Sequence, residues 1–167
     1  MKKLLALVMI FSLITSFLLA NSLELGSPAP QLKVLTDEDI TLDLGEALSA
    51  GTTLVFFYPK AMTPGCVKQA CSLRDGWDEL QSRGVKIFGV SSDTAKTQAQ
   101  FRDKYTLPFT LLADTDGKIA DAFSKGRWSR QAYIFRDGIL VWRDLMAATS
   151  NQATEILAAL DELKSSS

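Results

Sequence analysis

Residues 52–71 read TTLVFFYPKAMTPGCVKQAC, and they predict a buried strand followed directly by a helix. Thr52–Tyr58 is a continuous run of β-branched, aliphatic and aromatic residues, which is typical of a central strand covered on both faces. Thr63-Pro64 is a helix-start signature, because threonine is a favoured N-cap and proline is tolerated in the first helical turn. We therefore expect a helix from Pro64 to about Arg83.

The sequence on either side alternates between extended and helical patterns. Two hairpins are expected, around Thr36-Asp37-Glu38 and around Arg136-Asp137-Gly138, where Asp-Gly is a strong turn signal. The expected strands are Gln31–Leu35, Asp39–Leu44, Val85–Ser91, Phe109–Ala113, Ala132–Phe135 and Ile139–Leu145, and the expected helices are Thr94–Tyr105, Gly117–Phe123 and Asn151–Leu163. This order predicts an α/β fold with a mixed sheet flanked by helices. It matches a thioredoxin-like core with an N-terminal hairpin extension.

The composition excludes several classes of protein. The 167 residues are 47% hydrophobic and 22% charged, which rules out a disordered tail, a collagen-like fibre and a coiled coil. The 18 basic and 19 acidic residues create no net positive field that would attract nucleic acid. The chain has no histidine, so it cannot carry a Ser–His–Asp triad, a Cys–His pair, a histidine-ligated haem or a histidine-based zinc site. If the protein is an enzyme, another residue type carries the chemistry.

The first 22 residues resemble a targeting segment. Lys2 and Lys3 precede an uncharged run from Leu4 to Ala20, and Ala20-Asn21-Ser22 has the small residues of a signal-peptidase site. We expect residues 1–22 to be a signal peptide, with an uncleaved membrane anchor as the alternative. Both interpretations export residues 23–167, which we expect to form one thioredoxin-like domain in the periplasm or in a lumen of thylakoid type.

The two cysteines lie in the helix that follows the central strand. With Thr63 as N-cap, Cys66 falls in the first turn, where unpaired backbone N–H groups and the helix dipole favour a thiolate. Cys71 follows five residues later, about 140° around the axis, with the two Cα atoms about 8.7 Å apart. Disulfides span about 4.4–6.8 Å between Cα atoms, so these cysteines can bond only after the helix unwinds locally. The spacing indicates a redox pair that alternates between two conformations.

Other interpretations of the cysteines stay open at this point. An exported protein with two cysteines most often holds one structural disulfide. A zinc ion would be only half-ligated by two sulfurs. Dithiol exchange of the thioredoxin type uses Cys-x-x-Cys, from which the Cys-x4-Cys spacing departs.

The stretch from Phe56 to Asp75 resembles the peroxiredoxins, and in particular the bacterioferritin comigratory protein (PrxQ) subgroup. Peroxiredoxins share Pro-x-x-x-Thr-x-x-Cys, which Pro59, Thr63 and Cys66 fill at the right spacing. A second cysteine five residues on, here Cys71, is the mark of the subgroup. The resemblance extends from about Leu25 to Leu163 and includes Gly89-Val90-Ser91-Ser92-Asp93, Leu107-Pro108-Phe109 and the Asp114–Gly117 segment.

The resemblance implies a role for each matching residue. Cys66 would attack the peroxide O–O bond and become a sulfenic acid, which Cys71 would resolve to a disulfide. Thr63 would orient the peroxide, and Pro59 would shield the thiolate from water. Arg130 would stabilise the thiolate and the leaving oxygen. The implied enzyme is a thiol peroxidase for hydrogen peroxide and organic hydroperoxides, re-reduced by a thioredoxin-like donor; it needs no cofactor or metal and is a monomer.

Arg127, Arg130 and Arg136 lie close together in sequence, and any one of them could be a surface charge. The resemblance favours Arg130, because it immediately precedes the expected strand as in the family. The sequence departs from the family just before Arg130, because Phe123–Ser129 is shorter than the usual connection. Lys60, Met62 and Trp128 are candidates for the rim of the pocket or ordinary solvated and packed residues, whereas Trp77 and Trp142 are expected in the core or its edge. The alternative functions are an exported thioredoxin-fold thiol–disulfide carrier without peroxidase activity, and a one-cysteine peroxidase in which Cys71 is idle.

Overall fold

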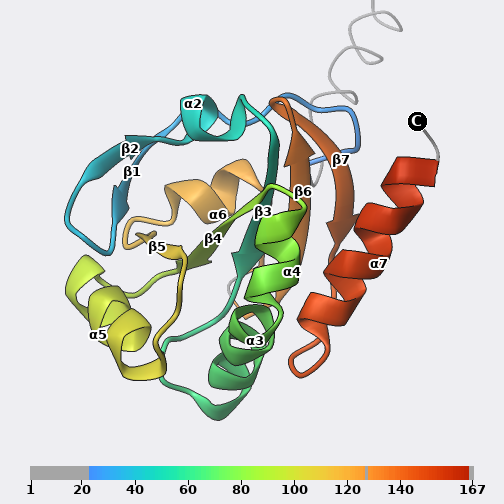
Figure 1. The fold of residues 1–167 in the computed structure, drawn as a ribbon. Helices are drawn as coiled ribbons and strands as arrows, with labels where there is room; N and C mark the ends of the chain where they lie inside the picture. Colours follow the sequence, from blue (N-terminus) through green and yellow to red (C-terminus); the bar gives the residue numbers. More distant parts are fainter. Residues whose placement is uncertain (1–22, 127, 166–167) are drawn as a thin grey trace, which may run out of the picture.

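The computed structural model describes residues 23–126 and 128–165, and within them the chain forms a seven-stranded mixed sheet. The strand order is β2-β1-β5-β4-β3-β6-β7, with β3, β4 and β5 parallel (Figure 1). The strands are β1 Lys33–Thr36, β2 Thr41–Asp43, β3 Thr52–Phe57, β4 Val85–Ser91, β5 Thr110–Ala113, β6 Gln131–Arg136 and β7 Ile139–Asp144. The run TTLVFF is thus the central strand β3, between β4 and the antiparallel β6, as the sequence predicts.

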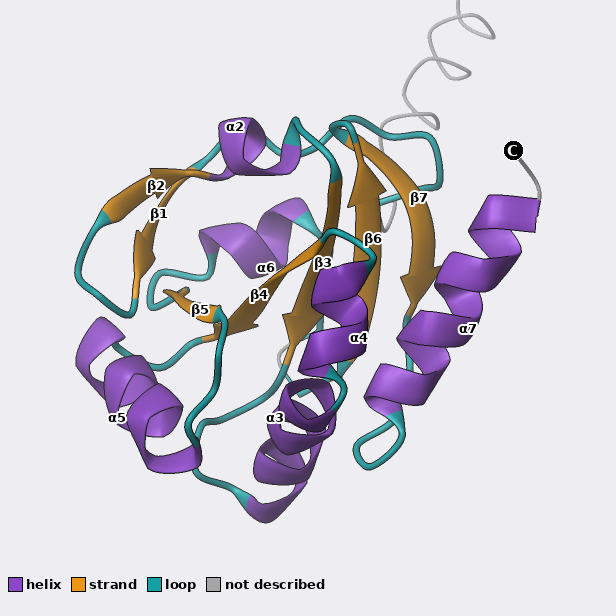
Figure 2. Ribbon diagram, viewed as in Figure 1, coloured by secondary structure: helices purple, strands orange, loops and turns teal. Residues whose placement is uncertain are grey.

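Helices cover both faces of the sheet (Figure 2). One face carries α3 Pro64–Asp75, α4 Trp77–Ser82, α5 Ala95–Tyr105 and α7 Gln152–Ser165. The other carries the short helices α2 Leu44–Leu48 and α6 Lys118–Ala122. Alternate residues of β3 point to the two faces, so Leu54 and Phe56 join the first hydrophobic cluster while Val55 and Phe57 join the second. All four are buried, which explains why the strand is apolar throughout.

Most of the predicted elements are confirmed within a residue or two. Both hairpins form, and the turn at Asp137-Gly138 has φ values of 50° and 79°, the left-handed conformation that Asp-Gly turns adopt. Trp77 and Trp142 are partly buried against the first cluster, as expected. The expected signal peptide, residues 1–22, lies outside the described part of the chain. Within the described residues, none of the helices has the length and apolar character needed to cross a membrane.

The helix expected from Pro64 to Arg83 is wrong, because the chain forms two helices separated at Gly76. A Cβ on Gly76 would lie 2.7 Å from the Cβ of Ala153 at the start of α7, so the glycine allows the two segments to approach closely. The helix α2 was also not expected; it begins where Asp43 accepts a hydrogen bond from the Glu46 N–H and caps it. At the C-terminus α7 extends to Ser165, two residues beyond the expected end at Leu163.

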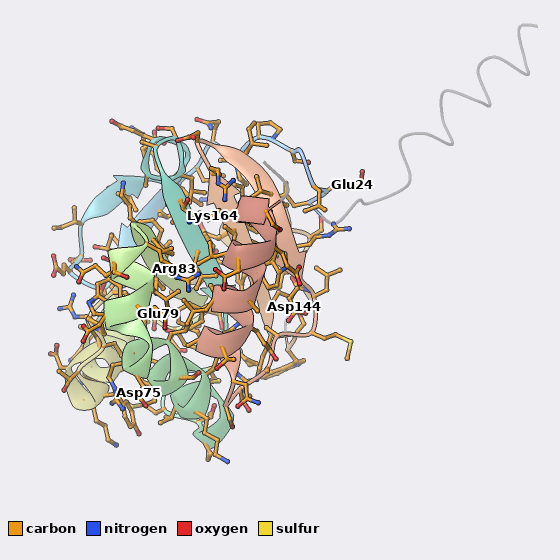
Figure 3. The ribbon with its side chains drawn as sticks, turned by 45° about the vertical axis from the view of Figure 1, so that its right-hand side comes forward. Glu24, Asp75, Glu79, Arg83, Asp144 and Lys164 are labelled. Carbon is orange, nitrogen blue, oxygen red and sulfur yellow. The ribbon has the colours of Figure 1, made fainter. Side chains whose placement is uncertain are left out.

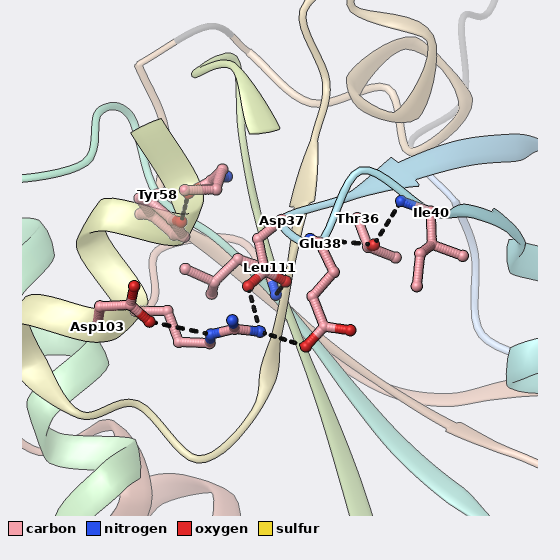
Figure 4. Close-up of polar contacts among 9 residues, drawn as sticks. Thr36, Asp37, Glu38, Ile40, Tyr58, Asp103 and Leu111 are labelled. Atoms are coloured by element: carbon pink, nitrogen blue, oxygen red, sulfur yellow. Dashed lines mark hydrogen bonds and ion pairs between the residues drawn. The ribbon is translucent and has the colours of Figure 1, made fainter. Parts of the chain in front are cut away.

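Two residues of helix α5, one turn apart, bond to other parts of the chain. Arg102 forms ion pairs with Asp37 and Glu38 in the β1–β2 turn (Figure 4). The Asp37 side chain is fully buried, and burial raises the pKa of its carboxyl. One turn earlier, Gln98 is buried against β3 and accepts a hydrogen bond from the Tyr58 hydroxyl. The Gln98 bond fixes Tyr58, the residue that follows β3 on the chain leading toward the cysteines.

Candidate active site

The loop between β3 and α3 is held from the neighbouring strand. Asp93 follows β4, and its Oδ2 accepts hydrogen bonds from the Ala61 N–H at 2.7 Å and from the Ser91 hydroxyl at 2.8 Å. Gln98 Nε2 donates to Ser91 Oγ at 3.0 Å. Met62 has a φ of 65°, which is uncommon for a residue with a side chain and marks a backbone that its surroundings must fix.

Cys66 lies in the first turn of α3 and is fully buried. Thr63 occupies the N-cap position as predicted, but its side chain does not cap the helix. Instead the Thr63 hydroxyl lies 3.0 Å from Cys66 Sγ and 2.9 Å from the Lys60 carbonyl oxygen. A hydroxyl has one proton to donate, so it can serve either the sulfur or the carbonyl and keeps its lone pairs for another donor.

Arg130 reaches the same sulfur from the segment that precedes β6. Its Nη1 donates to Cys66 Sγ at 3.3 Å and to Gln69 Oε1 at 2.9 Å. A Cβ on Gly65 would lie 2.7 Å from Arg130 Nη2, so a larger residue would displace the guanidinium from its position beside the helix. The positive charge and the helix N-terminus therefore meet at Cys66 Sγ, an arrangement that stabilises a thiolate.

Cys71 lies on the same helix and is not bonded to Cys66; both thiols are free. The residue is half-buried, and burial raises the pKa of its thiol, with the nearby Asp75 adding to the rise and Arg74 opposing it. The structure thus separates the two cysteines by an intact helical segment, as their spacing predicts.

The other candidate residues make no contact with Cys66 Sγ that the structure gives. Pro59 lines a cavity of about 480 Å³ between the ends of β3 and β4 and α6, together with Ser91 and Lys125. Lys60 is exposed, and Met62 is partly buried against the first hydrophobic cluster. Trp128 is exposed.

Comparison with known proteins assigns this geometry to a family. The sequence pattern of the AhpC/TSA family matches residues 25–143. The chain belongs to this family. It is a peroxiredoxin of the Bcp (PrxQ) type, a thiol peroxidase.

Its relatives cover most of the chain. A putative peroxiredoxin bcp of Haemophilus influenzae is 36% identical over 146 residues, which are 86% of this chain and 90% of the relative. Peroxiredoxin Bcp of Escherichia coli is 39% identical over 121 residues, 71% of this chain and 76% of the relative. Among solved structures, BcpB of Mycobacterium tuberculosis superposes with a TM-score of 0.78 at 27% identity, covering 84% of this chain and 97% of that one. Peroxiredoxin Q of Xanthomonas campestris gives 0.76 at 26% identity, covering 84% and 96%. The thioredoxin-like fold expected from the sequence is thereby confirmed.

Three residues support this peroxiredoxin's site without contacting Cys66 Sγ, and the sequence assigns none of them a role. Asp93 holds the loop through Ala61, Gln69 holds Arg130, and Gln152 of α7 holds Gln69. Asp93 and Gln69 fall inside stretches that match the family, which is a signal that could have drawn attention to them. Gln152 lies 83 residues from its partner, and no sequence pattern joins the two. Within the described residues, no group of three or more histidine, cysteine or acidic residues could hold a metal ion.

Proposed function

We propose that this peroxiredoxin reduces hydrogen peroxide and organic hydroperoxides with Cys66 as the nucleophile and Cys71 as the resolving residue. The observation that supports it most directly is the pair of donors, Thr63 and Arg130, that converge on Cys66 Sγ. The related bacterioferritin comigratory protein of Xanthomonas campestris, 25% identical to this chain, is described as having alkyl peroxide reduction activity.

In the first step the Cys66 thiolate attacks one peroxide oxygen. The S–O bond forms as the O–O bond breaks, and the electron pair of the O–O bond leaves on the second oxygen, which takes up a proton to give water or an alcohol. Cys66 is oxidised to the sulfenic acid and the peroxide is reduced. Arg130 stabilises the negative charge as it moves from sulfur to the leaving oxygen, and the Thr63 hydroxyl holds the peroxide in line with the sulfur.

In the second step Cys71 attacks the sulfenic sulfur. The S–S bond forms, the S–O bond breaks, and hydroxide leaves with the proton as water. Because the helix separates the cysteines, this step requires local unwinding of α3. A thioredoxin-like dithiol protein then returns two electrons and restores both thiols.

We place the enzyme outside the cytoplasm, in the periplasm or a comparable lumen, on the basis of residues 1–22. There it would defend exported components against peroxides.

A single-turnover experiment tests the proposal. Residues 23–167 are reduced, mixed with slightly less than one equivalent of hydrogen peroxide, and quenched with an alkylating reagent within one second. Mass mapping should find a Cys66–Cys71 disulfide within one chain, which the Cys66→Ser control cannot form. With Cys71→Ser the peroxide should still be consumed and the product should be a sulfenic or sulfinic acid at Cys66. Survival of both thiols in the unaltered protein would contradict the proposal and favour a thiol–disulfide carrier.

The resolving step should accelerate with pH. Burial raises the pKa of Cys71 above its ordinary value of about 8.5, so the thiol is protonated near pH 7 while the helix is closed. A pKa that is raised in the closed form favours closure at low pH, and this preference is lost as pH rises. Opening and thiolate formation therefore both increase with pH, and disulfide formation should rise between pH 7 and 9 by up to about tenfold per unit.

Rapid-quench measurement of the disulfide at several pH values checks this expectation. Asp75 contributes to the raised pKa of Cys71, so Asp75→Asn should move the rise to lower pH. A rate that is flat between pH 6.5 and 9 would show that the ionisation of Cys71 does not control the step.

A further inference from the structure

The segment of α3 between the two cysteines contains one buried polar side chain that bonds to other elements. Gln69 is fully buried, and its Nε2 donates to Gln152 Oε1 at 2.5 Å and to the Phe57 carbonyl oxygen at 3.4 Å. Its Oε1 accepts from Arg130. The segment cannot unwind far enough to join Cys66 to Cys71 without carrying Gln69 away from these partners.

The rest of α3 is fastened separately. Ser72 Oγ accepts from the Ala153 N–H at 3.2 Å, and Arg74 Nη1 donates to the Tyr105 carbonyl oxygen at 2.9 Å. Beyond the helix, Arg83 bonds to Asp161 of α7 and to Glu79; Figure 3 shows α7 running alongside α3 and α4, with Glu79 and Arg83 labelled on α4 and at its end. These contacts hold the region after Cys71 in place, so opening is confined to the stretch that Gln69 fastens.

Gln152 is the part of this fastening that lies outside the reacting segment. It is the first residue of α7, it is fully buried, and its Oε1 accepts the shortest of the hydrogen bonds that Gln69 makes. Its own Nε2 is buried with no hydrogen-bond partner among the described residues. A buried amide with one half unsatisfied stabilises the closed state less than a fully bonded one would. Gln152 therefore holds the segment closed through the bond to Gln69.

We propose that Gln152 is a positioning residue for the resolving step: through Gln69 it keeps the segment from Cys66 to Cys71 helical and sets how fast the disulfide forms. The inference rests on the proposed function of Cys71. By setting the rate of disulfide formation, Gln152 also determines which product the sulfenic acid gives. Resolution by Cys71 gives a disulfide and water, whereas reaction with a second peroxide gives a sulfinic acid and an alcohol or water. A tighter closed state lengthens the life of the sulfenic acid and favours the second outcome.

The test compares the two oxidation steps in Gln152→Met and Gln152→Glu. Methionine keeps the length of the side chain and removes the acceptor, so opening should become easier. We expect disulfide formation about tenfold faster, equivalent to about 1.4 kcal/mol, and a correspondingly smaller sulfinic fraction at a fixed excess of peroxide. The rate of sulfenic acid formation, monitored by trapping with a dimedone-type reagent, should stay within about twofold of that of the unaltered protein. Gln152→Glu retains an oxygen that accepts from Gln69, so it should resolve no faster than the unaltered protein.

The matched control is Ile156→Val, which loosens the same helix at a fully buried position one turn further on and leaves the groups of the Gln152–Gln69 hydrogen bond in place. It should leave the resolving rate unchanged. The inference is overturned if Gln152→Met resolves at the original rate, if Ile156→Val accelerates resolution equally, or if Gln152→Met slows sulfenic acid formation, since that would mean that Gln152 acts on Arg130. If the unaltered protein forms no Cys66–Cys71 disulfide at all, the proposed function itself fails.

Discussion

Replacement of Arg130 by methionine should lower the second-order rate constant for peroxide about 10³-fold. Its guanidinium donates to Cys66 Sγ at 3.3 Å and is the cationic group that the structure places on that sulfur. Removing one preorganised donor from a site of developing negative charge costs about 10²–10³ in rate, and here the donor also carries the charge that favours the thiolate. Stopped-flow measurement of Cys66 oxidation at pH 7 gives the rate constant.

Two further variants separate the charge from its geometry. Arg130→Lys keeps a positive charge, but an ammonium cannot donate from a planar fork to the sulfur and to Gln69 together, so it should recover only part of the loss. Arg143→Met removes a part-buried arginine of β7 that bonds to the Leu23 carbonyl oxygen, and it changes the net charge equally. We expect the rate constant of Arg143→Met for peroxide to stay within about twofold of that of the unaltered protein. A similar fall in both methionine variants would assign the effect to net charge and not to the position of Arg130.

The same guanidinium shows what the sequence could not decide. Three arginines lie close together in sequence, and only the family resemblance singled out Arg130. In the structure Arg136 is paired with Thr52 at the far end of β3 from the cysteines, while Arg130 precedes β6 at the end where α3 begins. Gly65 then makes room for the guanidinium. The choice depends on strand register and on a close approach across 65 residues, neither of which a local pattern contains.

The elements that the sequence predicted well are those defined by a local signal. The strand β4 is a mostly apolar segment with the predicted bounds, and α5 begins after Thr94, which caps it. The break between α3 and α4 carried only a weak local signal, the glycine at position 76. Leu73 and Leu80 both belong to the hydrophobic cluster on that face, so the apolar pattern continues across Gly76, and only the contact with α7 shows why the helix ends there.

The role of Gln69 illustrates the same limit within the site. A glutamine in a helix is by sequence an ordinary polar residue, most often exposed. Here it is fully buried, because Arg130, Gln152 and the Phe57 carbonyl satisfy its amide from three other elements. The buried bonds justify its burial, and they exist only once β3, α7 and the segment before β6 have assembled around α3.

Replacement of Thr63 by valine should lower the rate constant for peroxide about 10²-fold while leaving the free energy of unfolding nearly unchanged. Its hydroxyl lies 3.0 Å from Cys66 Sγ and makes no capping bond, so its loss removes a donor from the reacting sulfur without uncapping α3. The bond to the Lys60 carbonyl oxygen is also lost, but it is exposed and water can replace it. Thr63→Ser keeps the hydroxyl and should stay within about fivefold of the unaltered enzyme.

Thr94 provides the converse case within the same chain. It is also a threonine at a helix N-cap, but its Oγ1 accepts from the Thr97 N–H at 3.2 Å and so caps α5. Thr94→Val should therefore lower the free energy of unfolding by about 1 kcal/mol and leave peroxide reduction unchanged. Urea unfolding and stopped-flow kinetics on both variants give the comparison. If Thr63→Val lost stability like Thr94→Val and kept its rate constant, the Thr63 hydroxyl would stabilise the helix and not take part in the reaction. A lower rate constant with unchanged stability would show that the hydroxyl at the N-cap position of α3 acts on the reacting sulfur and does not cap the helix.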